Sequence, residues 1–259
     1  MNKLGSQLPH RASRSFRMQW LALIRDLIVT LLITGFLWLY LNHIAEFWTL
    51  ELSFWMYQTG LTGYANTSVS NAVGGISFIP AFDVVVPTTL PTTGRWWLTA
   101  LLCMILWLWS MRLAPNRLPL IYFMRLVILV QISSLVFFYM WPESLPTTIA
   151  NFLIDVLRQS ISLMLLVPAL YAATLYLFVL PWWIKYLATL TALFYLTIFV
   201  PLQASCIAWI LQVGGILFMP TLYLFFGLLP QIVALMGIYS FALSLLPADE
   251  TLFKRGIIR

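Results

Sequence analysis

Apolar runs of membrane-spanning length alternate with short polar stretches along the chain. A helix of roughly 20 apolar residues crosses a hydrocarbon core of about 30 Å and pairs its backbone groups within the segment. The runs predicted to cross the membrane cover residues 20–41, 96–113, 118–141, 160–180, 186–200 and 221–246. This pattern predicts an all-α polytopic membrane protein with about six transmembrane helices.

The stretch between the first two spans has a different pattern. Polar residues recur every three or four positions in residues 44–57, which predicts a helix lying in the membrane interface. Residues 67–73 and 76–85 favour strands, and Gly74-Gly75 between them tolerates the positive φ angles of a tight turn. We therefore predict a small external β-hairpin. Because an isolated hairpin is marginal in water, it needs support from the neighbouring helix, from loops or from another protein.

Two further segments are predicted to touch the membrane without crossing it. Residues 142–158 hold two prolines followed by apolar residues at helical spacing, which indicates a second interfacial helix. The last apolar tract, residues 204–246, is too long for one straight span. Residues 205–219 are therefore predicted to re-enter or to lie flat, with a break at Gly214-Gly215. The alternative is a seventh full span.

The few charged residues predict the orientation of the chain. Of the 259 residues, 62% are hydrophobic and 8% are charged, whereas soluble chains carry about 25% charged residues. The basic residues assigned to the inner side are Lys3, Arg11, Arg14, Arg17, Arg25, Arg112, Arg117, Lys185, Lys254, Arg255 and Arg259. On the outer side fall Arg95 and Arg158. Because basic residues are retained in the cytoplasm, both termini are predicted to be cytoplasmic, which requires an even number of spans.

These features predict a single integral membrane domain over residues 1–259. Its parts are a basic cytoplasmic tail (1–18), an external interfacial helix and hairpin (43–95), a five-span bundle with a re-entrant segment (96–246) and a cytoplasmic tail (247–259). Short external loops nearly free of cysteine favour a bacterial inner (plasma) membrane. The net charge of +6 is scattered over span ends, so the predicted partners are the lipid bilayer and other membrane or periplasmic proteins, not nucleic acid.

Two polar residues inside the third span are candidate binding residues. Arg125 lies about 12 Å from the inner end of that span at the helical rise. Charge at such depth is costly and often functional, although a long arginine stem can also carry its charge back to the headgroups. Gln131 lies further along, where polar side chains more often tie helices together than bind substrates.

The other candidates are predicted to face outward. Asp155 and Arg158 are three residues apart on a predicted helix and can pair across one turn. Together with Glu143 they offer ionic groups at the outer surface. In the hairpin, Phe78 and Asp83 are candidate contacts for a partner.

No motif points to catalysis, a cofactor or a metal. The sequence has no phosphate-binding loop, no zinc-protease motif, no hydrolase elbow and no paired cysteines at metal-ligand spacing. The surroundings of Cys206 superficially resemble the active-site cysteine of the exosortases, but no histidine follows it and the next arginine is Arg255. The family pattern is not met, and the chain is more typical of a non-enzyme.

The sequence therefore predicts a non-catalytic multi-pass subunit or scaffold of a larger envelope complex, such as a secretion, conjugation, pilus or surface-polymer apparatus. One alternative is a transporter for a small solute or lipid, with a midplane polar cavity lined by Arg125, Gln131, Gln212 and Gln231. The other is an enzyme that acts on a lipid-linked substrate at the outer surface through Glu143, Asp155, Arg158 and Asp83.

Overall fold

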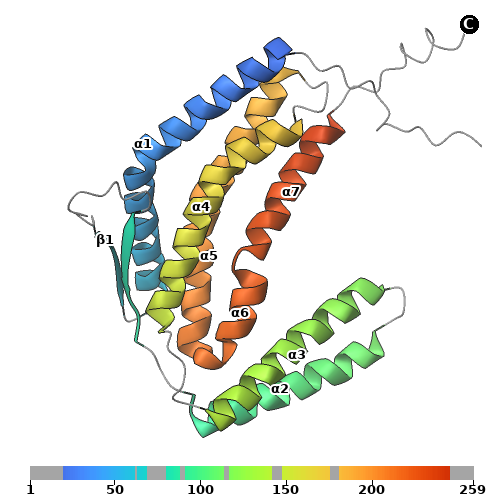
Figure 1. Cartoon of the computed structure of the whole chain (residues 1–259). Coiled ribbons are helices and arrows are strands. Elements are labelled where there is room, and N and C mark those ends of the chain that lie inside the picture. Colours follow the sequence, from blue (N-terminus) through green and yellow to red (C-terminus); the bar gives the residue numbers. More distant parts are fainter. Residues whose placement is uncertain are drawn as a thin grey trace, which may run out of the picture.

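The computed structural model describes residues 20–61, 63–68, 80–87, 91–113, 117–141, 148–175 and 181–245. Helices make up nearly all of these residues, and two short strands make a small sheet (Figure 1). The elements are α1 (Trp20–Gln58), β1 (Tyr64–Ser68), β2 (Ala81–Val85), α2 (Thr93–Arg112), α3 (Leu118–Met140), α4 (Ile149–Leu175), α5 (Trp182–Gly214), the 3-10 turn η3 (Ile216–Phe218), α6 (Met219–Phe226) and α7 (Leu229–Ser244).

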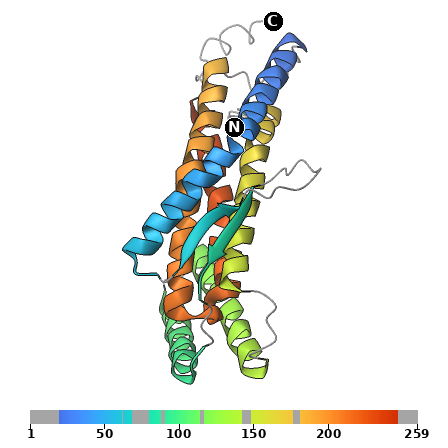
Figure 2. The same ribbon diagram turned by 90° about the vertical axis from the view of Figure 1, so that its left-hand side faces the viewer.

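Six helical segments in the described part of the chain are long and apolar enough to cross a membrane. Five of them belong to α1 through α5, and the sixth combines η3, α6 and α7 over Ile216–Ser244. The start of α1 and the end of α7 lie at the same end of the bundle (Figures 1 and 2). The prediction of an all-α, multi-pass membrane protein with about six spans and a small hairpin is confirmed.

α1 is longer than predicted, because the first span and the helix at 44–57 are one element. No glycine or proline interrupts the junction, and buried positions continue through it at helical spacing. They are Leu37, Leu41, Ala45, Trp48, Leu52 and Met56. Figure 1 shows α1 changing direction about halfway along, with its second half beside β1. The prediction of a separate interfacial helix was wrong, since this segment packs against the protein.

The end of α1 is set by a glycine. Gly60 has a φ of 68°, a left-handed conformation that glycine adopts without strain. The N–H of Gly60 donates to the Tyr57 carbonyl at 3.2 Å and that of Leu61 to the Met56 carbonyl at 2.9 Å. This is the Schellman arrangement, which satisfies the last carbonyls of a helix and turns the chain toward β1.

α4 and α5 contain two other segments that were predicted to be separate. α4 is continuous from Ile149, so the second interfacial helix is the beginning of the fourth span. α5 continues to Gly214, so residues 205–214 belong to the helix of the fifth span and are not a separate segment. The predicted break is present, because Gly215 has a φ of 82° and its N–H caps the Leu211 carbonyl at 2.9 Å.

β1 and β2 form a two-stranded antiparallel sheet. Tyr64 pairs with Val85 and Ser68 with Ala81. This register is centred on the predicted Gly-Gly turn, whose own residues lie outside the described ranges. β1 begins at Tyr64, three residues before the predicted arm, and β2 ends where predicted.

The sheet identifies a part of the molecule that lies outside the hydrocarbon layer. Unpaired backbone groups at an open sheet edge are not tolerated against lipid. α1 is about 58 Å long at 1.5 Å per residue, about twice the hydrocarbon thickness, so its second half extends beyond the membrane with the strands. We define the cap as β1, β2, residues 46–58 of α1 and residues 149–158 of α4.

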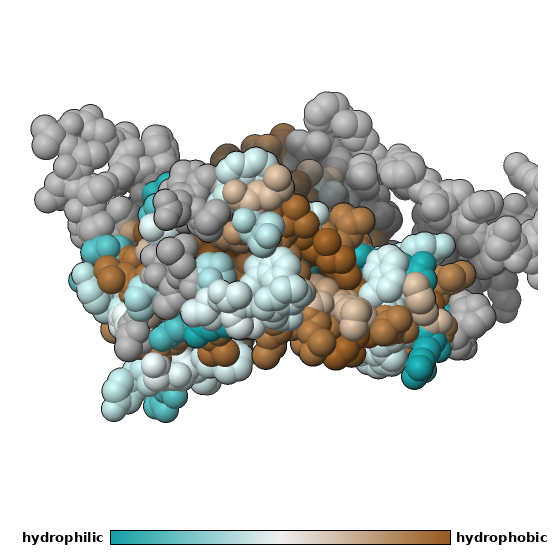
Figure 3. All heavy atoms as spheres, turned by 90° about the horizontal axis from the view of Figure 1, so that it is seen from below, coloured by the Kyte–Doolittle hydropathy of each residue, from teal (hydrophilic) through white to brown (hydrophobic). Residues whose placement is uncertain are grey.

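The surface of the molecule agrees with this division. Figure 2 shows the two strands side by side across the face of the bundle. Figure 3 shows hydrophilic residues on the left, the side on which the strands lie in Figure 1, and again at the right-hand end, with most of the hydrophobic residues between them. The strands thus lie at a polar end of this face, and its apolar part lies away from them.

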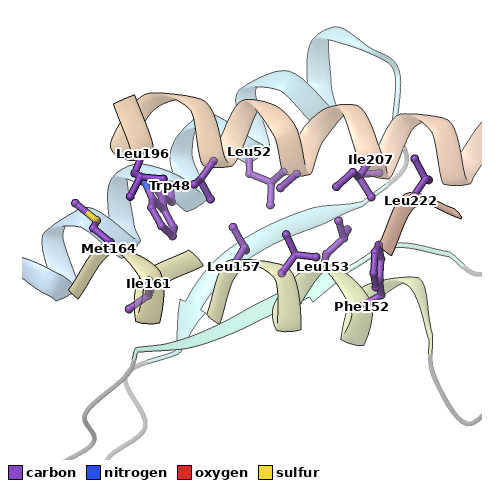
Figure 4. Packing of buried hydrophobic residues seen from close by; sticks show 14 of the residues in the cluster. Trp48, Leu52, Phe152, Leu153, Leu157, Ile161, Met164, Leu196, Ile207 and Leu222 are labelled. Atoms are coloured by element: carbon purple, nitrogen blue, oxygen red, sulfur yellow. The ribbon is translucent and has the colours of Figure 1, made fainter. Parts of the chain in front are cut away.

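A continuous apolar core joins α1, α4 and α5. In Figure 4, Trp48 and Leu52 of α1 and Ile207 of α5 point toward Leu153 and Leu157 of α4. All five side chains are at most 1% exposed. Within the cap, each such burial stabilises the fold by about 1.5–3 kcal/mol. Within lipid the hydrophobic gain disappears, and close packing and hydrogen bonds hold the helices together.

α2 and α3 form an antiparallel pair that projects from the other helices (Figure 1). The indole Nε1 of Trp96 on α2 donates to the Leu135 carbonyl on α3 at 3.0 Å. Toward the remaining helices, the main contacts of the pair are those of α3 with η3 and α6, where the rings of Phe123 and Phe225 lie 5.2 Å apart. The pair is thus attached through one narrow interface.

A proline in α5 creates the attachment point for α1. Pro201 has no N–H, so the Thr197 carbonyl, four residues earlier, loses its helical partner. The indole Nε1 of Trp48 donates to this carbonyl at 2.9 Å. Trp48 is completely buried, and its ring stacks on Phe82 of β2 at 6.5 Å between centroids. One side chain therefore connects α1, α5 and the sheet.

Replacing Trp48 by phenylalanine tests this connection. Trp48→Phe should lower the free energy of unfolding by about 1–2 kcal/mol, because the Thr197 carbonyl loses its donor while an aromatic ring remains. Detergent-induced unfolding in mixed micelles measures the change. Trp209→Phe, on the exposed surface of α5, is the matched control and should change stability by less than about 0.5 kcal/mol. Equal losses for the two variants would contradict the assignment.

Candidate functional site

A cluster of neutral polar side chains joins α3 to the break between α5 and α6. In a 3-10 turn the Leu217 carbonyl would pair with the N–H of residue 220, which is a proline and has none. Gln131 Nε2 donates to this carbonyl at 3.0 Å, and Ser134 Oγ donates to it at 2.6 Å. Thr221 Oγ1 donates to Gln131 Oε1 at 2.6 Å. Both ends of the Gln131 amide are therefore used to hold α3 in place.

A second cluster lies between α4, α5 and α7. Pro230 removes the helical donor of the Phe226 carbonyl, and the Gln203 amide donates to that oxygen instead. Gln231 is completely buried. Its Nε2 donates to Ser160 Oγ at 2.8 Å and to Gln203 Oε1 at 3.2 Å. These bonds connect three helices through amide and hydroxyl groups.

The three connections have the same physical basis. Trp48, Gln131 and Gln203 each donate to a carbonyl that a proline has left without its regular partner. None of these donors titrates near neutral pH, so the arrangement is suited to attaching helices and not to moving protons. Gln131 was recognisable from the sequence as a polar residue inside a span, whereas the roles of Trp48 and Gln203 were not. Three prolines in apolar tracts indicate that some helical carbonyls lack a donor. They do not indicate which side chain donates to which carbonyl.

Arg125 lies on the side of α3 that meets α2. Its Cζ is 5.7 Å from the centre of the Trp107 ring, within cation–π range. Trp107 is about 7.5 Å from Arg112 along α2, so the guanidinium is directed toward the turn between α2 and α3. Its Nε has no hydrogen-bond partner within the described structure. The structure does not bring Arg125 and Gln131 into one site, since Gln131 meets η3 and α6.

A cluster of charged residues connects the beginning of α1 to α5. Asp26 is 6% exposed and accepts hydrogen bonds from Arg25 Nη2 at 2.9 Å and from Tyr186 Oη at 3.2 Å. Lys185 Nζ lies 3.4 Å from the other carboxylate oxygen. A buried carboxylate requires such partners because its desolvation is costly. Two cations around one anion give this end of the interface a net positive charge.

Three of the predicted external candidates are described by the structure and lie on the cap: Asp83, Asp155 and Arg158. Asp83 and Asn66 are opposite each other in the sheet, and both are exposed. Asp155 and Arg158 are exposed on α4, and within the described part of this helix they make no salt bridge with each other. The remaining two predicted candidates lie outside the described residues: Phe78 and Glu143.

The described ranges contain no group of three or more His, Cys, Asp or Glu side chains that could hold a metal ion. His43 Nδ1 lies 3.4 Å from Glu46 Oε2 on an exposed surface. Cys103 is buried and Cys206 is exposed, and both are free thiols. The polar groups found together are thus those of the interhelical connections and the Asp26 cluster.

Comparison with known proteins gives no relative: no family model, curated protein or solved structure matches this chain. Its function has to be argued from the contacts described above.

The connection between α3 and η3 can be tested with two neighbouring serines. Ser134→Ala should lower the free energy of unfolding by about 0.5–1.5 kcal/mol, because one donor to the Leu217 carbonyl is lost in a water-poor environment. Ser133→Ala is the matched control, since Ser133 is exposed and bonds to its own helix at the Leu129 carbonyl. Detergent-induced unfolding of both variants provides the measurement. A larger loss for Ser133→Ala would show that the connection has been misassigned.

Proposed function

We propose that this protein is a non-catalytic, multi-pass membrane scaffold that holds a partner protein of a larger envelope complex at its cap. The class of complex that we propose is a secretion, conjugation, pilus or surface-polymer apparatus. The observation that carries the proposal is a sheet whose inner face is fixed to the helices and whose outer face is exposed.

The two faces of the sheet differ in their surroundings. Phe82 and Val84 of β2 are buried against α1 and α4, and Ser53 Oγ of α1 donates to the Ala65 carbonyl of β1 at 3.1 Å. The alternate residues of both strands point away from the bundle and are exposed. They are Tyr64, Asn66, Asp83 and Val85. A rigidly supported sheet with an aromatic, an amide, a carboxylate and an apolar side chain on its free face suits protein recognition, and open strand edges suit strand addition.

The polar side chains in the spans support the same proposal. Gln131 and Gln203 direct their amides to carbonyls of neighbouring helices in this chain. Gln231 bridges α4 and α5 in the same way. Side chains bound in this manner hold the bundle together, which a scaffold requires, and they are not free to line a path for a solute.

For the orientation, we propose a bacterial inner membrane with both termini in the cytoplasm and the cap on the opposite side. The support is the distribution of charge. The basic residues Arg25 and Lys185 lie at the end of the bundle where α1 begins, and the acidic residues Glu46, Glu51 and Asp83 lie in the cap. Cationic side chains are retained on the cytoplasmic side of a membrane.

Photocrosslinking from the sheet tests the scaffold role. With p-benzoylphenylalanine in place of Tyr64, irradiation of native membranes should give one protein adduct of defined mass, because this side chain is on the free face of the cap. The same replacement at Tyr122, an exposed residue of α3, is the matched control and should give lipid adducts. The scaffold proposal fails if the Tyr64 position also reacts with lipid alone.

Cysteine labelling tests the orientation separately. In a chain with Cys103→Ser and Cys206→Ser, a membrane-impermeant maleimide applied to intact spheroplasts should label Asn66→Cys. It should reach Trp183→Cys, at the beginning of α5, only after the membrane is opened. Both positions are exposed in the fold, so a difference reports sidedness. The reverse pattern would refute the proposed orientation and leave the partner experiment unaffected.

A further inference from the structure

An apolar groove of about 700 Å³ lies between the first half of α1 and α5. Its walls are exposed side chains of the two helices, Leu32 and Phe36 on one side and Leu190 and Phe194 on the other. Met164 of α4 is buried at its floor. This volume falls within the range of about 300–1,000 Å³ that is usual for small-molecule sites.

The groove exists because α1 contacts α5 at two separated places. At one end, Asp26 meets Lys185 and Tyr186. At the other end, Trp48 donates to the Thr197 carbonyl. The groove lies between these contacts and runs about 18 Å along α1, from Leu32 to Ile44. This length is close to one leaflet of the hydrocarbon core, about 15 Å.

The end of the groove nearest the start of α1 carries positive charge. Arg25 and Lys185 surround the single carboxylate of Asp26, and the Arg25 side chain is 49% exposed. Along the helices, Asp26 is about 9 Å from Leu32, and Lys185 is about 7.5 Å from Leu190. Both helices therefore place the charged cluster just beyond the same end of the groove, where a headgroup would meet it.

We propose that this groove binds one anionic phospholipid. An acyl chain lies between α1 and α5, and the phosphate contacts Arg25 beside the Asp26–Lys185 pair. The lipid belongs to the leaflet at the end of the bundle where α1 begins. Apolar walls of one-leaflet length match the chain, and the net cationic rim matches the headgroup, which distinguishes this ligand from a second protein helix. The proposal does not depend on the scaffold function.

Native mass spectrometry of the full chain, titrated with phosphatidylglycerol or phosphatidylcholine, tests the site. The wild-type protein should bind one phosphatidylglycerol more tightly than phosphatidylcholine. Leu32→Trp should weaken this binding about tenfold by filling the groove. Leu31→Trp is the matched control, because Leu31 is equally exposed but does not line the groove, and it should bind as the wild type does. Leu190→Trp fills the groove from the opposite wall and should reproduce the loss if Leu32→Trp misfolds.

The headgroup contact has its own variant. Arg25→Gln should reduce the preference for phosphatidylglycerol over phosphatidylcholine while binding of phosphatidylcholine stays the same. Equal affinity of the wild-type protein for the two lipids would overturn the anionic assignment. Identical behaviour of Leu31→Trp and Leu32→Trp would overturn the site. A mass of two chains that Leu32→Trp converts to one would show that a second copy occupies the groove instead.

Discussion

Every backbone carbonyl buried inside a helix bundle needs a donor from the protein, because neither lipid chains nor apolar side chains offer one. This constraint organises the bundle. Prolines in α5, α6 and α7 leave the carbonyls of Thr197, Leu217 and Phe226 without their regular donors. Each of these carbonyls accepts a hydrogen bond from another helix. The missing hydrogen bond within one helix is thus replaced by a hydrogen bond between two helices.

These connections explain why so few polar residues are sufficient to hold the spans together. Inside lipid, apolar side chains gain little from contact with one another compared with contact with lipid chains, so packing alone discriminates weakly between arrangements. A bond to one particular carbonyl selects one arrangement. Trp48 fixes α1 on α5, and Gln131 with Ser134 fixes the projecting α2–α3 pair on η3.

The cap follows different physics. Its surroundings are aqueous, so burial of Leu52, Leu153 and Phe82 contributes the ordinary hydrophobic stabilisation. A hairpin that would be marginal alone is supported by α1 and α4, whose extension beyond the membrane provides its base. One part of α1 is surrounded by lipid and the other part by water. This is why α1 is about twice as long as a single span requires.

The class of fold, the number of spans, the hairpin and the break at Gly214-Gly215 could be predicted from the sequence, because these depend on local composition and on backbone freedom. The sequence did not determine that the segment after Leu41 continues α1, or that residues 205–214 extend α5. An amphipathic helix has the same sequence pattern whether its apolar face meets lipid headgroups or a neighbouring helix. Among the candidate residues, Gln131 was recognisable as a polar group inside a span, but its partners were not. The pairing of Trp48 with Thr197, and of Asp26 with Lys185, joins positions 149 and 159 residues apart. Only the tertiary structure decides such pairs, because they depend on which helices become neighbours and at what height they meet.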